Sequence, residues 1–200
     1  MTDLFAQKAA EWDQLPFPQA ISAGVGHALK THVTFEPEWQ VMDFGAGTGL
    51  VASVVAPHVA NVVAVDVSES MLAALAAKPE LQGRVEPICQ DILTTPLGRH
   101  FDLIVSAMAM HHVADTSLLL RRFADHLNPG GRVALADLDA EDGTFHPPET
   151  EGVFHAGFDR AAFGGLLAEA GFEDVAFTTA LEVSREGKRY PIFLVTARKG

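Results

Sequence analysis

The feature that most constrains the fold of this chain is a glycine-rich stretch at residues 41–49, which reads VMDFGAGTG. A short apolar run reaches Asp43, three glycines then alternate with other residues, and a helix-like apolar run extends from Leu50 to Ala56. Glycine at such positions lets the backbone turn sharply and approach a ligand closely, because no Cβ is in the way. A strand, a tight glycine turn and a helix in this order are typical of a nucleotide-binding βα unit.

The spacing of the glycines separates two classes of nucleotide site. The dinucleotide fingerprint G-x-G-x-x-G requires a glycine at position 50, where this chain has Leu50. The spacing therefore points away from a pyrophosphate cofactor and toward S-adenosylmethionine (SAM). An NAD(P)-dependent oxidoreductase is the less favoured alternative. No Tyr-x-x-x-Lys pair supports it, since the single tyrosine, Tyr190, is followed by Pro191.

Strand-like and helix-like segments alternate along the chain, which predicts a doubly wound, Rossmann-like α/β fold with helices on both faces of a mostly parallel sheet. We expect seven strands, at residues 39–44, 61–66, 84–89, 101–107, 131–138, 173–182 and 190–198. We expect helices at residues 4–13, 19–32, 50–58, 69–77, 116–127 and 159–170. The last two strands flank residues 184–187 (SREG), a hairpin signal, so the sheet should end in an antiparallel pair.

Local signals place the ends of several of these elements. Ser68 and Asp159 are expected to cap the helices that follow them. Residues 128–131 (NPGG) should end one helix and turn the chain into the next strand.

Size and composition limit the class of protein. The chain fits one domain over residues 1–200, with a helical cap at 1–35 and a lid loop at 139–158. A net charge of −12 argues against a nucleic-acid partner, and no apolar run approaches the ~20 residues that span a bilayer, so no membrane partner is expected. A single cysteine, Cys89, excludes a disulfide framework and indicates the cytoplasm. We expect Cys89 to be buried in its strand.

Four motifs, in order, resemble those of the class I SAM-dependent methyltransferases. They are residues 41–49, 62–72, 89–93 and 101–115, followed by 127–133 (LNPGGRV). Within that class the chain is similar to the small-molecule branch, such as the ubiquinone/menaquinone biosynthesis methyltransferases. The opening segment at 5–13 (FAQKAAEWD) also resembles the N-terminal helix of that branch.

The resemblance implies one set of residues for the methionine part of SAM. The backbone of Gly45, Ala46 and Gly47 would lie along it, and Asp43 would contact its ammonium. The backbone carbonyls of Ser106 and Ala107 would hold the same ammonium. The alternative for Asp43 is a structural acid that the backbone amides of the turn satisfy.

A second set is implied for the adenosine part. Asp66 follows Gly45 by 21 residues, and its carboxylate can accept hydrogen bonds from both ribose hydroxyls, although the same spacing suits an NAD ribose. Val67 and Met71 would bracket the adenine. Asp91 would accept a hydrogen bond from the adenine amino group, and the backbone N–H of Ile92 would face a ring nitrogen. The alternatives are a helix cap for Asp66, a core position for Met71 and a solvated turn for Asp91.

The loop after the strand at 101–107 should face the cofactor, because ligands bind beyond the carboxyl ends of the strands. His111 and His112 are the pair in this loop suited to proton transfer near neutral pH. We expect at most one of them near substrate, since adjacent side chains usually diverge, and we favour His112 as the catalytic base. The alternative is a structural contact to Asp115 or to the lid loop.

No metal site is expected, because no compact ligand spacing such as H-E-x-x-H is present. The candidate ligands would converge only if the lid loop folded over the histidine loop; they are His111, His112, Asp115, Asp139, Glu141, His146 and His155. Met108 and Met110 are expected to line the path of the methyl group.

The reaction that the resemblance implies is an SN2 transfer of the SAM methyl group to a small-molecule acceptor, which leaves S-adenosylhomocysteine (SAH). A non-catalytic module that binds SAM or SAH is the alternative from another class. The sequence makes no prediction for the oligomeric state.

Overall fold

The computed structural model describes residues 9 and 11–200. The first expected helix, at 4–13, therefore lies mostly outside the described residues, and its described end is a short 3-10 turn, η1 (Trp12–Gln14). Within the described residues, no helix has the length and apolar character needed to cross a membrane.

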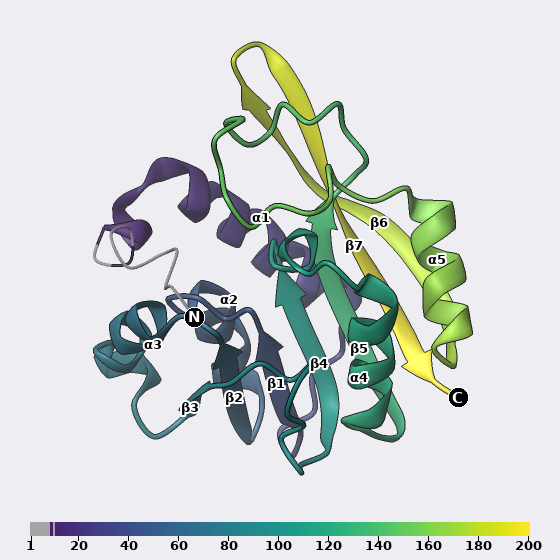
Figure 1. Cartoon of the computed structure of the whole chain (residues 1–200). Helices are drawn as coiled ribbons and strands as arrows, with labels where there is room; N and C mark the ends of the chain where they lie inside the picture. Colours follow the sequence, from purple (N-terminus) through teal and green to yellow (C-terminus); the bar gives the residue numbers. More distant parts are fainter. Residues whose placement is uncertain (1–8, 10) are drawn as a thin grey trace.

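A seven-stranded sheet forms the centre of the molecule (Figure 1). Its strands are β1 (Gln40–Phe44), β2 (Asn61–Asp66), β3 (Val85–Cys89), β4 (Phe101–Ala107), β5 (Leu127–Leu138), β6 (Phe172–Arg185) and β7 (Lys188–Lys199). Their order in space is β3-β2-β1-β4-β5-β7-β6. The pairs from β3 to β5 are parallel, and β7 is antiparallel to both β5 and β6. The predicted doubly wound sheet with an antiparallel end is confirmed.

Helices cover both faces of the sheet. They are α1 (Pro16–His32), α2 (Leu50–Val55), α3 (Glu69–Ala76), α4 (Thr116–Asp125) and α5 (Arg160–Glu169), with 3-10 turns η2 (Ala56–His58), η3 (Pro79–Leu81) and η4 (Met110–His112). The core that includes α1 and α2 contacts one set of alternating strand residues, such as Val41, and the core that includes α4 and α5 contacts the other, such as Met42. Figure 1 shows α4 and α5 together on the near face.

Three helices have a boundary that differs from the predicted one by two or more residues. α1 begins three residues early at Pro16, because proline is well tolerated in a first helical turn, where its missing N–H has no partner to lose. The predicted helix at 50–58 divides into α2 and η2 at Pro57. α4 ends at Asp125 rather than at residue 127, because Leu127 already pairs with Phe101 in the sheet.

Residues 128–131 were predicted to form a turn that precedes a strand, but they lie inside β5. Leu127 pairs with Phe101 and Arg132 pairs with Leu103, so β5 carries four residues where β4 carries one. Gly130 has a φ of 74°, which allows the extra residues to loop out of the ladder. The residue types at 128–131 predicted a turn. Because β5 pairs with β4 on both sides of these residues, they form a bulge within the strand.

The hairpin between β6 and β7 closes on two residues with positive φ, Glu186 at 51° and Gly187 at 79°. Two consecutive positive φ angles are those of a type I′ turn, whose twist matches paired strands. Arg185 and Lys188 pair on either side of it, which confirms the predicted hairpin.

The predicted caps are confirmed, and the prediction for the single cysteine is wrong. The Ser68 hydroxyl accepts from the Met71 N–H at 3.2 Å, and the Asp159 carboxylate accepts from the Ala162 N–H at 2.9 Å. Cys89 is exposed. β3 is an edge strand, so it lacks a neighbour on one side, and the assumption of burial on both faces does not hold there.

Candidate functional site

The glycine turn lies at the carboxyl ends of the central strands, where a site was predicted. Gly45 and Gly47 have φ angles of 65° and 53°, in the left-handed region. A Cβ on Gly45 would lie 2.2 Å from the Cβ of Ala109, so this glycine lets the two loops touch. A Cβ on Gly47 would meet no atom of the described residues within 4 Å, so among them it would project into open space above the turn. That space is the predicted position of the ligand.

Asp66, at the end of β2, fixes the shape of the turn. Its Oδ2 accepts from the N–H of Gly47 at 2.8 Å, and its Oδ1 accepts from the N–H of Ser68 at 2.9 Å. The helix cap considered as its alternative role belongs to Ser68. The carboxylate is partly buried and lies beside the predicted ligand space.

Asp43, at the end of β1, is a buried acid with an unsatisfied oxygen. Its side chain is 1% exposed, and its Oδ2 has no hydrogen-bond partner among the described residues. Burial, and secondly the charge of Asp66, raises its pKa to about 8, against the lowering effect of a backbone hydrogen bond from Ala52. The alternative role, an acid satisfied by the turn, therefore accounts for part of the carboxyl group only.

The residues predicted for the adenosine part lie in different environments. Val67, directly after Asp66, is a large apolar side chain that is 55% exposed. Met71 is buried in α3, as its core alternative has it. The Asp91 carboxylate accepts from the Leu93 N–H at 2.9 Å in a turn, and the Ile92 side chain is fully buried beneath it.

The end of β4 is held tightly against β1. The Ser106 hydroxyl donates to the Phe44 carbonyl at 2.9 Å. Met108 has a φ of 57°, which is rare for a residue other than glycine and marks a strained turn directly after Ala107. Met110, expected along the methyl path, is fully buried in the core with α4, so that expectation is wrong.

His111 is buried beside a carboxylate that the sequence did not single out. Its Nδ1–H donates to Asp137 Oδ1 at 2.6 Å, and Asp137 is fully buried in β5. Asp137 Oδ2 also accepts from the backbone N–H groups of Met110 and His111, at 3.0 and 3.2 Å. The available signal was an acid inside the apolar strand ALADL, since buried acids are kept only with partners.

His111 and His112 were expected to diverge, but instead they share one cluster with His146. The rings of His111 and His112 have centroids 4.2 Å apart. His146 Nε2 lies 3.1 Å from His111 Nε2, and the Nδ1–H of His112 donates to the Gly152 carbonyl at 2.8 Å. Of the two structural contacts considered as alternatives, the one to the lid loop forms, while the Asp115 carboxylate, within the described residues, caps α4 through the N–H of Leu118.

The pKa of His146 is lowered to about 4, so this imidazole is neutral at physiological pH. Burial is the largest cause, followed by the neighbouring His111 and His112 and then by Arg185, while Asp137 acts in the opposite direction.

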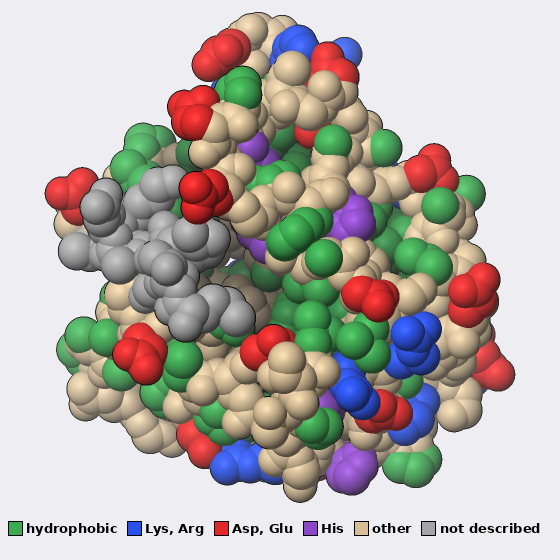
Figure 2. Space-filling view, viewed as in Figure 1, with side chains coloured by type: hydrophobic (Ala, Val, Ile, Leu, Met, Phe, Trp, Pro, Cys, Tyr) green, Lys and Arg blue, Asp and Glu red, His purple; other side chains and the backbone are tan. Residues whose placement is uncertain are grey.

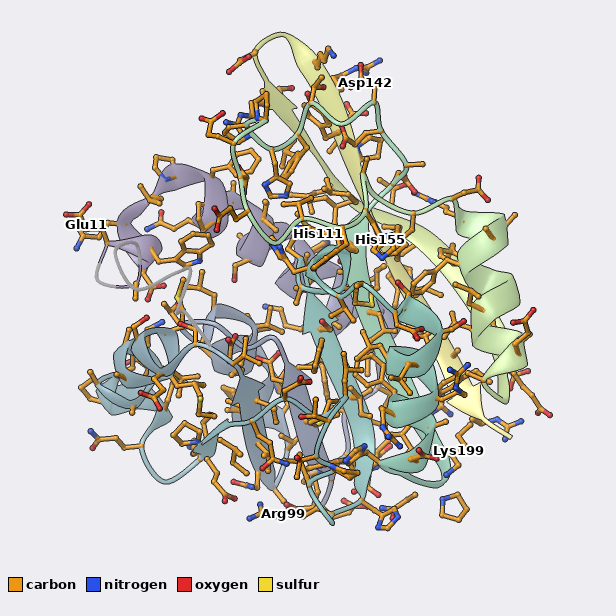
Figure 3. The ribbon with its side chains drawn as sticks, in the orientation of Figure 1. Glu11, Arg99, His111, Asp142, His155 and Lys199 are labelled. Atoms are coloured by element: carbon orange, nitrogen blue, oxygen red, sulfur yellow. The ribbon has the colours of Figure 1, made fainter. Side chains whose placement is uncertain are left out.

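The loop at 139–158 folds over the histidine loop and contains no helix. Its two ends pair through a bridge between Asp139 and Phe158. In its middle, the N–H groups of Phe154 and His155 donate to the His111 carbonyl at 3.0 and 3.3 Å. Figure 3 shows His111 and His155 beside each other below the part of the loop that carries Asp142.

Aromatic rings fasten the far side of this loop. Phe145 is 3% exposed and packs edge-on against Tyr190, with ring centroids 5.3 Å apart. Its ring also lies 5.5 Å from that of Phe17 in α1. In contrast, Phe154 is 59% exposed. Figure 2 shows histidine side chains at the surface on this face of the molecule.

The segment before α1 contacts the glycine turn. The sequence analysis did not predict this contact. The Thr48 hydroxyl donates to Asp13 Oδ1 at 2.5 Å, and Lys78 forms an ion pair with the same carboxylate. α1 itself packs on the sheet face through buried residues such as Val25 and contacts β6. Of the predicted cap at 1–35, the described part nearest the site is therefore residues 11–15.

These features fit two parts of SAM, its methionine end and its base. The unsatisfied Asp43 oxygen is suited to an ammonium, and the open space above Gly47 lets a ligand approach the backbone. The exposed Val67 offers an apolar surface for a base.

Comparison with known proteins shows what this region is similar to. Residues 41–131 match the family model described as a methyltransferase domain. An uncharacterized methyltransferase of Schizosaccharomyces pombe is 31% identical over 133 residues, which are 58% of this chain and 47% of the relative. The ubiquinone biosynthesis O-methyltransferase of Coxiella burnetii is 32% identical over 101 residues, 50% of this chain and 43% of the relative. The chain thus spans about half the length of the curated relatives it matches.

A solved structure supports the same fold over nearly the whole chain. The N-methyltransferase NodS of Bradyrhizobium japonicum, in complex with SAH, superposes with a TM-score of 0.72. The match covers 98% of this chain and 94% of NodS at 17% identity. The resemblance to methyltransferases seen in the sequence motifs, including those of ubiquinone biosynthesis, is confirmed.

Proposed function

We propose that this chain, which carries a methyltransferase domain over residues 41–131, transfers the methyl group of SAM to a small-molecule acceptor. The observation that carries the proposal is the buried carboxyl oxygen of Asp43 beside the glycine turn, which has no hydrogen-bond partner among the described residues. A dinucleotide has no ammonium at this position to satisfy it. Leu50 in place of the third fingerprint glycine argues against NAD(P) independently.

Each part of the cofactor has a proposed set of contacts. Asp43 holds the ammonium together with the backbone carbonyls of Ser106 and Ala107. The backbone of Gly45, Ala46 and Gly47 follows the methionine chain. Asp66 accepts from the ribose hydroxyls, while Val67, Met71, Asp91 and Ile92 surround the adenine.

SAM supplies an electrophilic methyl group, which the lone pair of an acceptor atom displaces from sulfur. The protein contributes mainly by aligning the two reactants in a site from which water is excluded, an effect worth up to about 7–11 kcal/mol. We propose that the loop at 139–158 provides this exclusion, and its backbone hydrogen bonds to the His111 carbonyl support this role. We propose that this loop and the N-terminal cap at 1–35 select the acceptor.

A proton must leave acceptors whose attacking atom carries one. Because the Nδ1–H of His111 donates to Asp137, its Nε2 carries the lone pair that can accept a proton. The Nδ1–H of His112 donates to the Gly152 carbonyl, so the Nε2 of His112 also carries a lone pair that can accept a proton. We therefore propose both histidines as proton acceptors.

We also propose a cytoplasmic location, since a single cysteine suits a reducing compartment.

The test is calorimetric titration of the purified chain with SAM, SAH and NADH, repeated on Asp66→Ala. We expect micromolar binding of SAM and SAH, at least tenfold weaker binding in the variant, and no heat with NADH. Circular dichroism checks that the variant is folded. Absence of SAM binding by the folded protein would contradict the proposal, and binding of NADH instead would favour the oxidoreductase.

A second step separates an enzyme from a non-catalytic binding module. Small-molecule acceptors with hydroxyl, amine and thiol groups are screened for SAH release by the same protein. Tight SAM binding without turnover on any of these classes would favour the binding module.

A further inference from the structure

We propose that His111, His112 and His146 bind a divalent transition-metal ion of the class that imidazole ligands select, with Zn²⁺ as the first candidate. A ring nitrogen of each histidine lies within 4.8 Å of a ring nitrogen of the other two. The three come from two segments, the 3-10 turn η4 and the loop at 139–158.

The spacing of the nitrogens is close to that of a metal site. Two imidazole ligands on tetrahedral Zn²⁺, each about 2.0–2.1 Å from the metal, are about 3.3 Å apart. The Nε2 atoms of His111 and His146 are 3.1 Å apart. The ring centroid of His112 lies 4.2 Å from that of His111 and 5.7 Å from that of His146. One ring nitrogen of each of the three lies within 4.8 Å of the others, so the rings would rotate to close around one ion.

Two of the rings are already oriented by acceptors behind them, as metal-binding histidines generally are. Asp137 Oδ1 accepts the Nδ1–H of His111 at 2.6 Å, and the Gly152 carbonyl accepts that of His112 at 2.8 Å. These bonds fix the tautomers and direct both Nε2 lone pairs away from the acceptors. The buried charge of Asp137 also offsets part of the charge of a cation.

The other account of the same contacts is a hydrogen bond from His146 Nε2–H to the His111 Nε2. It explains the 3.1 Å distance between these two nitrogens. It does not require His112 to face the same point, and it predicts no metal affinity beyond that of surface histidines. The two accounts therefore differ in a measurable quantity.

A site with three protein ligands leaves a coordination position open. Under the proposed methyl transfer, on which this step alone rests, that position suits an acceptor with an oxygen or nitrogen donor beside the atom to be methylated. Coordination and proton acceptance use the same nitrogen lone pairs, so the metal test also decides between the two roles of these histidines.

The experiment measures metal binding by the full chain without any turnover assay. The protein is treated with EDTA, exchanged into metal-free buffer, and titrated with Zn²⁺ against a chromophoric chelator; Co²⁺ absorption reports the geometry. We expect one ion per chain, with affinity at least a hundredfold lower in His146→Gln and His111→Gln and about 10–100-fold lower in Asp137→Asn. His27→Gln, in exposed helical surface, and His155→Gln, in the same loop outside the cluster, should bind as the wild type does.

Equal affinity of the wild type and His146→Gln would overturn the proposal, as would a Co²⁺ spectrum of six-coordinate, water-like ions. Because His146 is only partly buried, its variant should fold even where Asp137→Asn does not. SAM binding is measured in the same samples. SAM binding without metal binding would contradict the metal site alone. Metal binding without SAM binding would contradict the proposed function alone.

Discussion

At the scale of single residues, the site is built from acids whose environments differ. Asp66 has both carboxyl oxygens in hydrogen bonds to backbone N–H groups. Asp43 is buried with one oxygen unsatisfied among the described residues, and its pKa is about 8. The protein thus holds a proton on Asp43 that a bound cation would displace.

Asp43 should make stability fall as pH rises. Its pKa is about 8 in the folded chain against an ordinary value of 3.8 for an aspartate, so between these values the folded state binds more protons than the unfolded state. The free energy of unfolding should then fall by up to about 1.4 kcal/mol per pH unit relative to Asp43→Asn. Urea unfolding of both proteins at pH 5 and pH 7 measures this. The control is Asp125→Asn, at an exposed helix end, and equal pH slopes for wild type and Asp43→Asn would refute the prediction.

Cofactor binding should release the same proton. An ammonium beside Asp43 favours its ionised form, so SAM binding at pH 7 should release up to about one proton per chain. Calorimetry in buffers of different ionisation enthalpy gives this number. Asp43→Asn should release none, and a buffer-independent heat in the wild type would contradict the proposed contact.

The two glycines should respond differently to alanine. Gly45→Ala should lower stability by about 2–4 kcal/mol, since its Cβ would lie 2.2 Å from Ala109 in an already left-handed conformation. Gly47→Ala should cost only about 1 kcal/mol, as its Cβ meets no atom within 4 Å in the described part of the chain, but should weaken SAM binding at least tenfold. Urea unfolding and calorimetry measure both effects. Gly83→Ala is the control, since Gly83 also has a positive φ and open surroundings within the described residues. Gly47→Ala with unchanged SAM affinity would refute the ligand position.

At the scale of elements, prediction was best where the strands are central. The expected strands at 61–66 and 101–107 have the observed bounds, because strands buried on both faces read as continuous apolar runs. Prediction was weaker at the edges and in the long loop. The exposed Cys89 and the bulge at 128–131 depend on which strand lies alongside, and local sequence does not contain that information.

The loop at 139–158 should depend on one aromatic anchor. Phe145 is buried against Tyr190 and Phe17, so Phe145→Ala should lower stability by about 3 kcal/mol and raise amide exchange across the loop. Phe154→Ala is the matched control in the same loop; at 59% exposure it should change stability by less than about 0.5 kcal/mol. Similar effects from the two variants would show that Phe145 does not anchor the loop.

At the scale of the whole molecule, the site joins parts that lie far apart in the chain. The Thr48 hydroxyl of the glycine turn contacts Asp13 before α1, and the histidine loop contacts Asp137 in β5 and Gly152 in the long loop. Figure 1 shows these segments meeting at one end of the sheet. A ligand bound there should therefore stabilise the fold as a unit.

SAH should raise the thermal unfolding midpoint. At a hundred times its dissociation constant it adds about 2.7 kcal/mol to the free energy of unfolding, which corresponds to about 5–10 °C for a domain of this size. Differential scanning calorimetry of the wild type and of Asp66→Ala measures the shift. A shift of equal size in the variant would contradict the proposed role of Asp66.

The sequence by itself determined the fold class and the glycine turn, because these depend on short-range patterns, whereas Asp43, Asp66 and Asp91 became candidates through the resemblance of their motifs to those of methyltransferases. A strand, a turn and a helix are each encoded within about ten residues, and the glycines are required by local backbone geometry.

Only the tertiary structure decided what surrounds these residues. It paired His111 with Asp137, brought His146 to both histidines of η4, and left an oxygen of Asp43 unsatisfied among the described residues. Burial and charge proximity between segments separated by 26 and 35 residues arise from packing. No periodicity or spacing within a segment encodes them, since the protons and lone pairs concerned meet only when the chain is folded.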